Sequence, residues 1–365
     1  MSDLFSPVCL GELELANRVV MAPMTRNRAG VNDEPTAHMV EYYRQRATAG
    51  LIITEGTHPS RAGKGYYRTP GIHEPVQIAG WRNVATAVHA AGGRIVLQLM
   101  HCGRASVKAN KAPDAETVAP SAIRCRAEIP GPDGKRAEPD MPRALETAEV
   151  ERVIEEYAQS ARNARAAGLD GVELHCTSGY LPMQFLSTGT NRRTDRYGGS
   201  LPNRLRFVVE TLEALAAAVG PGRVGLRIFP GNPFNDMQDD DAASTYAALL
   251  QAIKGFGLAY VHLIHAPTET LDALALVKTH WSGPVIANNN LSLDTARALL
   301  AEGRVDAVSF ARLFISNPDL VERFRRGVPL AVPDRSTFYT GESAGYTDYP
   351  TASLEAEVRR HAAAT

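Results

Sequence analysis

Three features that mark whole classes of protein are scarce in this chain: cysteine, long apolar runs and an excess of charge of one sign. Its four cysteines are scattered over 365 residues without a Cys-x-x-Cys spacing, which argues against a disulfide framework and against a zinc or iron-sulfur site. No apolar run approaches the roughly 20 residues that span a bilayer, and residues 1–15 lack the basic and apolar regions of a secretion signal. We therefore expect a soluble, cytoplasmic protein with reduced thiols, no metal and no membrane partner.

The charge of the chain is nearly balanced, which argues against binding to nucleic acid. The sequence has 39 Lys and Arg against 40 Asp and Glu, a formal net charge of -1. Proteins that bind nucleic acid draw most of their affinity from concentrated Lys and Arg, and the basic cluster at residues 191–197 is short and isolated. We expect no nucleic-acid partner.

What the chain does have is a recurring pattern of short segments rich in Val, Ile and Leu, each preceded by a stretch of helical character. Their apolar residues are continuous rather than alternating, which is typical of strands covered on both faces in a parallel sheet. Several helical stretches end in glycine, such as Gly168 and Gly257, the residue that best accepts left-handed geometry after a helix. The expected strands lie within residues 18–24, 51–56, 94–100, 171–175, 223–229, 259–264, 284–288 and 306–310.

Eight repeats of strand and helix predict an α/β fold, the (β/α)8 TIM barrel, in a chain longer than the ~250 residues typical of it. The rival, an open doubly wound sheet, needs a glycine-rich dinucleotide loop after its first strand, and "APMTRNRAG" at residues 22–30 is not one. Two stretches interrupt the repeat. Residues 101–146, rich in Pro, Gly and charge, predict a lid or binding loop after the third strand, and the aromatics of residues 333–365 predict a C-terminal segment that packs on the barrel. We expect one domain over residues 1–365.

In such a barrel the chemistry gathers at the C-terminal ends of the strands. Hydrogen-bond donors dominate these positions and carboxylates are few, which argues against a magnesium site or two-carboxylate hydrolysis and fits an anionic cofactor. The last two strands of these barrels commonly bind phosphate, although an arginine there is as often part of a surface ion pair. In chain order the strand ends offer Thr25, Gly56, Gln98, His101, His175, Tyr180, Arg227, His262, Asn288, Asn289, Asn290 and Arg312.

Four longer motifs carry a resemblance to a known family. They are "NRVVMAPMTRNRA" at 17–29, "GVELHCTSGYLPMQFLS" at 171–187, "NRRTDRYGGSLPNRLRF" at 191–207 and "FYTGESAGYTDYP" at 338–350. Together they resemble the Old Yellow Enzyme family of FMN-dependent ene-reductases, near its bacterial pentaerythritol tetranitrate and N-ethylmaleimide reductase branch. The resemblance implies FMN as cofactor, NADPH or NADH as hydride donor, and a small-molecule substrate with an activated C=C bond, such as an α,β-unsaturated carbonyl compound.

The resemblance also implies where the flavin lies, over the mouth of the barrel. Thr25 would bind its O4 edge, Gln98 would hold its pyrimidine edge, and Arg227 would stabilise the anionic reduced form beside N1. The full set of expected cofactor residues is Pro23, Met24, Thr25, Gly56, Gln98, His175, Arg227, Asn289, Asn290, Ala311 and Arg312.

Catalytic roles follow from the same resemblance. His175 and Ser178 would polarise the substrate carbonyl, because hydride addition builds negative charge on its oxygen, and Tyr180 would protonate the α-carbon. The residues expected to line the substrate pocket or its lid are Tyr66, Met100, Arg143 and Tyr339.

At several of these positions the chain departs from the family pattern. Ser178 stands where relatives carry His or Asn, and its hydroxyl reaches less far, so we expect weaker activation of the carbonyl. Met100 replaces a frequent Trp and should widen the pocket. Ala311 replaces a glycine that lets the backbone approach phosphate closely, and the Asn-rich loop at 287–290 would have to compensate.

Two alternatives to an ene-reductase stay open at this point. The same flavin site could serve nitrate-ester or nitro reduction or the isomerisation of a double bond, and the departures from the pattern leave room for a flavin-free barrel that only binds a ligand. The physiological substrate, the choice between NADPH and NADH, and whether the protein is a monomer or a homodimer are not encoded in any motif.

Overall fold

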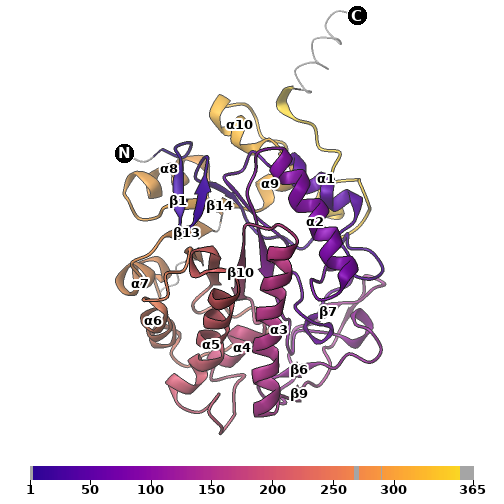
Figure 1. Ribbon diagram of the computed structural model, residues 1–365, viewed down its shortest axis with the longest axis vertical. Helices are drawn as coiled ribbons and strands as arrows, with labels where there is room; N and C mark the ends of the chain where they lie inside the picture. The colour runs from indigo at the N-terminus through magenta and orange to yellow at the C-terminus, as the bar shows by residue number, and fades with distance from the viewer. Residues whose placement is uncertain (1–2, 267–270, 289, 354–365) are drawn as a thin grey trace, which may run out of the picture.

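A closed barrel of eight parallel strands forms the centre of the protein (Figure 1). The computed structural model describes residues 3–266, 271–288 and 290–353. Each strand pairs with the next along the chain and the last returns to the first, which confirms the predicted TIM barrel. The barrel strands are β3 (Val19–Met21), β4 (Leu51–Ile53), β5 (Ile95–Leu99), β10 (Gly171–Cys176), β11 (Val224–Ile228), β12 (Tyr260–Ile264), β13 (Val285–Asn288) and β14 (Ala307–Phe310), each within or overlapping its expected segment.

Helices alternate with the barrel strands and cover the outside of the barrel (Figure 1). Local signals set their ends: Ser292 and Thr295 form a reciprocal capping box at the start of α8, and Gly168 and Gly257 take the expected left-handed φ of 88° and 71°. The helices are α1 (Ala37–Gln45), α2 (Pro75–Ala90), α3 (Thr147–Ala166), α4 (Leu181–Leu186), α5 (Leu201–Val219), α6 (Ala242–Ile253), α7 (Ala273–His280), α8 (Leu293–Ala301), α9 (Arg312–Ser316) and α10 (Leu320–Arg326). No helix in the described ranges is long and apolar enough to cross a membrane.

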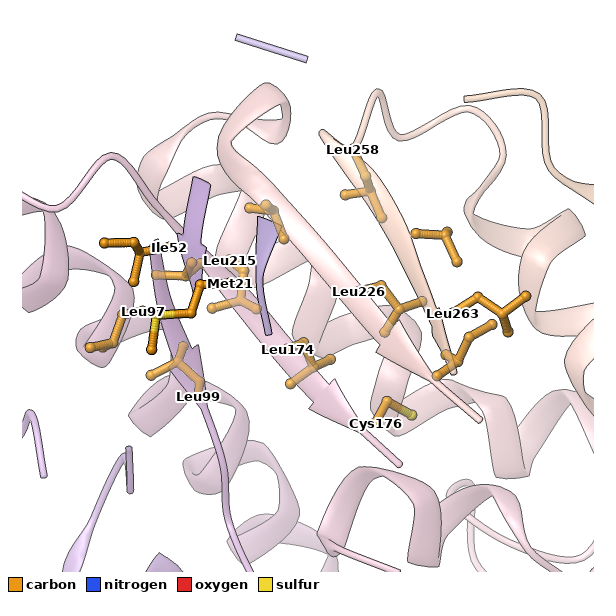
Figure 2. Packing of buried hydrophobic residues seen from close by; sticks show 14 of the residues in the cluster. Met21, Ile52, Leu97, Leu99, Leu174, Cys176, Leu215, Leu226, Leu258 and Leu263 are labelled. Atoms are coloured by element: carbon orange, nitrogen blue, oxygen red, sulfur yellow. The ribbon is translucent and has the colours of Figure 1, made fainter. Parts of the chain in front are cut away.

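Strand alternation divides each barrel strand into two faces. Leu97, Leu174, Leu226 and Leu263 lie in the large apolar cluster that the strands share with the surrounding helices, where Leu215 of α5 joins them (Figure 2). The residues between them along each strand face the opposite way, into the barrel. One set of strands therefore supplies both the core under the helices and the interior of the barrel.

A hairpin that the sequence pattern did not predict closes the N-terminal end of the barrel. Strands β1 (Val8–Leu10) and β2 (Leu13–Leu15) pair in antiparallel fashion, and their leucines pack on Leu51 and other inward residues of the barrel. Gly11 in the turn has φ 59°, and a Cβ there would stand 2.5 Å from the Gly222 carbonyl oxygen, so only glycine fits. No continuous apolar run marks these strands, because Cys9 and Glu14, which lie between the apolar residues, are exposed.

The insertion at residues 101–146 carries two small sheets of its own. Strand β6 (Val118–Ala119) pairs with β9 (Arg143–Ala144), and β7 (Ile129–Pro130) pairs with β8 (Arg136–Ala137). Val107 and Ile129 of the insertion lie in one apolar cluster with Met100 and Tyr180, at the C-terminal end of the barrel. The insertion therefore forms a wall beside the residues for which chemistry is expected.

Buried arginines hold the C-terminal segment against the barrel. Arg26 donates to the carbonyl oxygens of Phe338 and Gly345 at 2.9 Å each, and Arg28 donates to that of Thr337 at 2.8 Å. Tyr346 stacks on Tyr42 of α1 with 4.0 Å between ring centroids. Because Arg26 follows Thr25 directly, this segment docks beside the end of β3. Short 3-10 turns at Arg61–Gly63, Lys108–Asn110, Pro221–Arg223 and Arg335–Thr337 complete the described elements.

Candidate active site

A cavity of about 150 Å³ opens at the C-terminal ends of the barrel strands. Apart from Phe234 and Ile264, every residue of its wall is one for which the sequence predicts a role in cofactor binding, substrate binding or catalysis. The wall consists of Pro23, Met24, Thr25, Gly56, Gln98, Met100, His175, Ser178, Tyr180, Arg227, Phe234 and Ile264.

Larger hollows exist elsewhere, but their position argues against catalysis. One of about 350 Å³ is lined by Asn17, Gly50 and Arg94, which precede β3, β4 and β5 and so lie at the N-terminal end of the barrel. Active sites of this fold lie at the opposite end. We therefore assign the site by its chemistry rather than by volume.

His175 enters the cavity from β10 as a neutral imidazole. Burial, followed by the charge of Arg227, lowers the pKa of His175 to about 3, so its ring carries one proton at neutral pH. Among the described residues none pairs with its buried Nδ1, and its ring lies edge-on to that of Tyr180 at 4.9 Å. A buried polar ring without a protein partner is what a bound ligand would satisfy.

Tyr180 stands at the start of α4 and is only 7% exposed. Its hydroxyl lies 3.0 Å from that of Tyr66. Burial, assisted by the Tyr66 phenol, raises the pKa of Tyr180 well above its usual value. The phenol therefore keeps its proton throughout the physiological range and can act only as a donor of that proton.

Ser178 occupies a strained turn between these two residues. It has φ 56°, in the left-handed region that glycine and asparagine tolerate best, and its carbonyl oxygen accepts a 2.8 Å hydrogen bond from the Asn235 amide. The Ser178 side chain lines the cavity. Its hydroxyl reaches less far than the His175 imidazole, so His175 is the main hydrogen-bond donor to a ligand there. An asparagine would tolerate this backbone conformation better and would reach further into the cavity.

Gln98 and Arg227 line the cavity from inside the barrel. Arg227 donates from Nη2 to Asn288 Oδ1 at 2.9 Å, and although burial lowers the pKa of Arg227 to about 10, it remains a cation at neutral pH. Gln98 donates from Nε2 to Glu173 Oε1 at 2.7 Å. With Thr25, these side chains form a hydrogen-bonding set that fits the carbonyl and N–H groups of the pyrimidine edge of a flavin.

Gly56, which follows β4, also lines the cavity. A Cβ at this position would stand 2.5 Å from Sδ of Met100, so any side chain would displace Met100, which lines the same cavity. The absence of a side chain at residue 56 is thus part of the shape of the site.

The expected phosphate residues lie at the ends of β13 and β14, outside the wall of the cavity. Arg312 donates to Oδ1 of Asn290, and both side chains are exposed. Ala311 precedes α9, whose first backbone amides lack partners within the helix. Asn289 lies outside the described residues.

The expected substrate residues are not gathered equally. Tyr66 reaches the site through its bond to Tyr180, whereas Tyr339 is 59% exposed on the docked C-terminal segment. Arg143 is not part of the cavity wall, and its guanidinium bonds Glu116 at 2.8 Å and Glu149 at 2.7 Å. Its role in substrate binding stays a prediction.

Some residues of the site escaped the sequence pattern. Phe234, 57% exposed, lies in an irregular loop where no period marks it, whereas Ile264 is two residues beyond inward-facing His262 and strand alternation could have found it. The expectation of few carboxylates holds for the wall but not beneath it, where Glu173 is fully buried. In the described part of the chain, no three His, Cys, Asp or Glu side chains are placed to hold a metal ion.

Comparisons with known proteins identify relatives over nearly the whole chain. The family model described as "NADH:flavin oxidoreductase / NADH oxidase family" matches residues 3–331. A probable flavin mononucleotide-dependent alkene reductase of Leishmania infantum is 39% identical over 95% of this chain and 97% of its own length. The 12-oxophytodienoate reductase 1 of Oryza sativa subsp. japonica is also 39% identical, over 95% of this chain and 92% of its own length.

Solved structures share the fold over nearly the whole chain. Morphinone reductase superposes with a TM-score of 0.92 at 43% identity, covering 97% of each chain. An old yellow enzyme homologue from Zymomonas mobilis gives a TM-score of 0.92 at 35% identity, covering 95% of this chain and 99% of its own. The resemblance inferred from the motifs is confirmed, and a flavin-free binding barrel is disfavoured. The chain belongs to the NADH:flavin oxidoreductase / NADH oxidase family and is an Old Yellow Enzyme-like flavin oxidoreductase.

Proposed function

We propose that the protein is an FMN-dependent ene-reductase that uses NADPH or NADH to reduce the activated C=C bond of α,β-unsaturated carbonyl compounds. The observation that carries this proposal is the wall of one cavity, where a neutral imidazole and a protonated phenol lie beside Gln98 and Arg227, whose hydrogen-bonding groups fit a flavin. Relatives named as alkene reductases support it.

The donor set defines how the cofactor would be held. Gln98 and Arg227 would bind the pyrimidine edge, Thr25 the O4 edge, and Gly56 would leave room for the ring. The phosphate would be held by Asn289, Asn290, Ala311 and Arg312. The flavin ring would lie against Pro23 and Met24. Bound there and reduced by the nicotinamide, FMN supplies the hydride that is added to the substrate.

The remaining residues act on the substrate. His175 donates to the carbonyl oxygen, on which negative charge develops as hydride adds to the β-carbon, and Ser178 assists directly or through water. Tyr180 delivers its proton to the α-carbon, and the 3.0 Å contact with Tyr66 holds its hydroxyl in place. Met100, Tyr66, Tyr339 and Arg143 complete the pocket or its lid.

The wider organisation belongs to the same proposal. Residues 1–365 would act as one domain, with residues 101–146 as the lid and residues 333–365 as the C-terminal segment on the barrel. We infer a cytoplasmic monomer or homodimer, which size-exclusion chromatography with light scattering distinguishes.

Two measurements test the proposal. The purified protein should show the visible absorption of bound FMN, and it should oxidise NADPH or NADH in the presence of 2-cyclohexenone or N-ethylmaleimide, giving the saturated product. A colourless protein that takes up no FMN would overturn the flavin assignment. A flavoprotein that leaves both alkenes intact would overturn only the ene-reductase assignment.

The alternative is reduction of nitrate esters or nitro compounds, or double-bond isomerisation, at the same site. Ser178 favours reduction of nitro compounds and nitrate esters, because these strongly electron-poor substrates depend less on a second hydrogen-bond donor beside His175. Anaerobic turnover of an unsaturated lactone with and without NADPH separates these reactions, because isomerisation consumes no reductant.

A further inference from the structure

A buried carboxylate lies directly beneath the cavity, where the mechanism above assigns it no role. Glu173 of β10 is fully buried and points into the barrel, one inward position before His175. Its two oxygens are both engaged: Oε1 accepts from Gln98 Nε2 at 2.7 Å, and Oε2 lies 2.8 Å from His262 Nδ1. A charge removed from water in this way is costly unless it is fully paired.

The protons of this network can be assigned from its partners. An ionised carboxylate only accepts hydrogen bonds, so His262 Nδ1 must carry the proton, and Nε2 is left as the acceptor, 2.8 Å from Ser309 Oγ. Arg227 Nη1 lies 2.9 Å from Nδ1 and 2.8 Å from Nε2, and of these two nitrogens only the unprotonated Nε2 can accept from it. Burial and the charge of Arg227 lower the pKa of His262 to about 4, which keeps this ring neutral. The network thus holds one anion, Glu173, and one cation, Arg227.

The same logic fixes Gln98. Because Glu173 can only accept, the Gln98 amide must turn its nitrogen toward the carboxylate and leave its oxygen as the terminal atom for the cavity. The amide oxygen can accept a hydrogen bond from the ring N–H of a pyrimidine-dione. A flipped amide would present its NH2 group instead, and two donors would face each other.

We propose that Glu173 is a positioning residue for the flavin, which orients Gln98 directly and Arg227 through His262, and whose charge offsets that of Arg227 beneath the ring. The inference rests on the cofactor site proposed above. Glu173 would then affect the reduction potential of bound FMN although it touches neither the cofactor nor the substrate.

The sign of the effect follows from electrostatics. Reduction places negative charge on the flavin, which Arg227 attracts and Glu173 opposes. Removing the carboxylate charge therefore favours the reduced form and makes the midpoint potential more positive. The amide that replaces the carboxylate in a Gln variant can donate as well as accept, so it no longer forces one orientation on Gln98, and oxidised FMN should bind less tightly.

Glu173→Gln is the direct test, because the amide is isosteric and can keep bonds to Gln98 and His262 with the other imidazole tautomer. We expect the preference for reduced over oxidised FMN to rise about tenfold, which is about 30 mV for a two-electron couple. The potential is measured by anaerobic reduction against a reference dye, and the dissociation constant of FMN by recovery of flavin fluorescence.

Two further variants keep the outcome interpretable. Glu173→Asp retains the charge but shortens the reach, so its potential should stay nearer the native value than that of Glu173→Gln while FMN affinity falls. Asp306→Asn is the matched control, since this carboxylate accepts a 2.8 Å bond from Val285 N at the N-terminal end of the barrel, and its potential should equal that of the native protein.

The result that overturns the inference is a Glu173→Gln protein whose FMN potential and affinity match those of Asp306→Asn, which would leave Glu173 as a core residue alone. If Glu173→Gln does not fold, an Asp variant with native potential and native FMN affinity has the same consequence. Because neither measurement uses an alkene, the inference can fail while ene-reductase activity is retained. A native protein that binds no flavin would instead refute the proposed function.

Discussion

The two ends of the barrel interior are built from the same strands but hold opposite kinds of side chain. At the N-terminal end, inward-facing Val20, Leu51, Ile53 and Val96 pack against the leucines of the β1–β2 hairpin. At the C-terminal end the next inward positions are polar, among them Gln98, Glu173, Arg227 and His262, all buried. The comparison teaches that one end serves stability and the other chemistry, because an apolar plug gains from burial whereas buried polar groups hold together only as a paired network.

The largest expected effect is a loss of alkene reduction after a substitution at the C-terminal, polar end of the barrel. Tyr180→Phe removes the proton donor but keeps the ring, so alkene reduction should slow by about 10²–10⁴-fold, while reduction of the flavin by NADPH stays within a small factor of native. Stopped-flow measurement of the two half-reactions checks this. Tyr246→Phe, at a buried phenol of α6 outside the cavity wall, is the matched control. Equal loss in both variants would show that Tyr180 acts through packing.

The reverse should hold at the apolar end. Leu51→Ala leaves a cavity under the hairpin and should lower the free energy of unfolding by about 2–5 kcal/mol. Denaturant titration of the FMN-loaded protein measures this loss. Its turnover of 2-cyclohexenone at 25 °C should stay within twofold of native, and a strong fall in turnover would mean that the two ends are coupled.

Acidification should destabilise the protein through histidine rings that are buried in the neutral form. Burial lowers the pKa of His101 and His175 to about 3 and that of His73 and His262 to about 4. The unfolded chain takes up protons on these rings below pH 6.5 before the folded chain does, so their contribution to stability is complete above pH 6.5 and is lost as the pH falls toward 4.

Two carboxyl groups act in the opposite sense. Burial raises the pKa of Glu55 to about 7 and also raises the pKa of Glu156, so the stability that these two groups contribute is lost as the pH rises above about 4.5. With four rings against two carboxyls, the free energy of unfolding should be lower at pH 5 than at pH 7.5. Urea titrations at both values measure it. The difference should shrink in His262→Gln, and an equal difference in that variant would contradict the buried neutral ring.

The smallest expected effect concerns Ser178. An asparagine extends a donor toward the substrate oxygen and relaxes the left-handed backbone, so Ser178→Asn should bind a phenolic ligand several-fold more tightly and reduce 2-cyclohexenone several-fold faster, as one hydrogen bond of about 1 kcal/mol implies. Ligand titration by flavin absorbance and steady-state rates measure this. Unchanged values for both would mean that Ser178 does not face the activated oxygen.

Much of this site was accessible from the chain alone because each barrel strand ends where its apolar run stops. Thr25, Gln98, His175 and Arg227 were placed by that rule, and the motifs supplied their expected partners. Arg143 marks the limit of such reasoning: a motif position cannot reveal that Glu116 and Glu149 engage its guanidinium. Phe234 marks another, since irregular loops carry no period.

The sequence by itself determined the eight strands, the barrel and the family, because apolar runs and local caps act over short distances along the chain. Only the tertiary structure decided which inward-facing groups meet: Glu173 reaches Gln98 and His262 across separate strands, and Arg26 reaches residues more than 300 positions away. Closure of the barrel creates these contacts, and no local pattern encodes them. The pairing of one buried anion with one buried cation under the cavity is a property of that closed geometry.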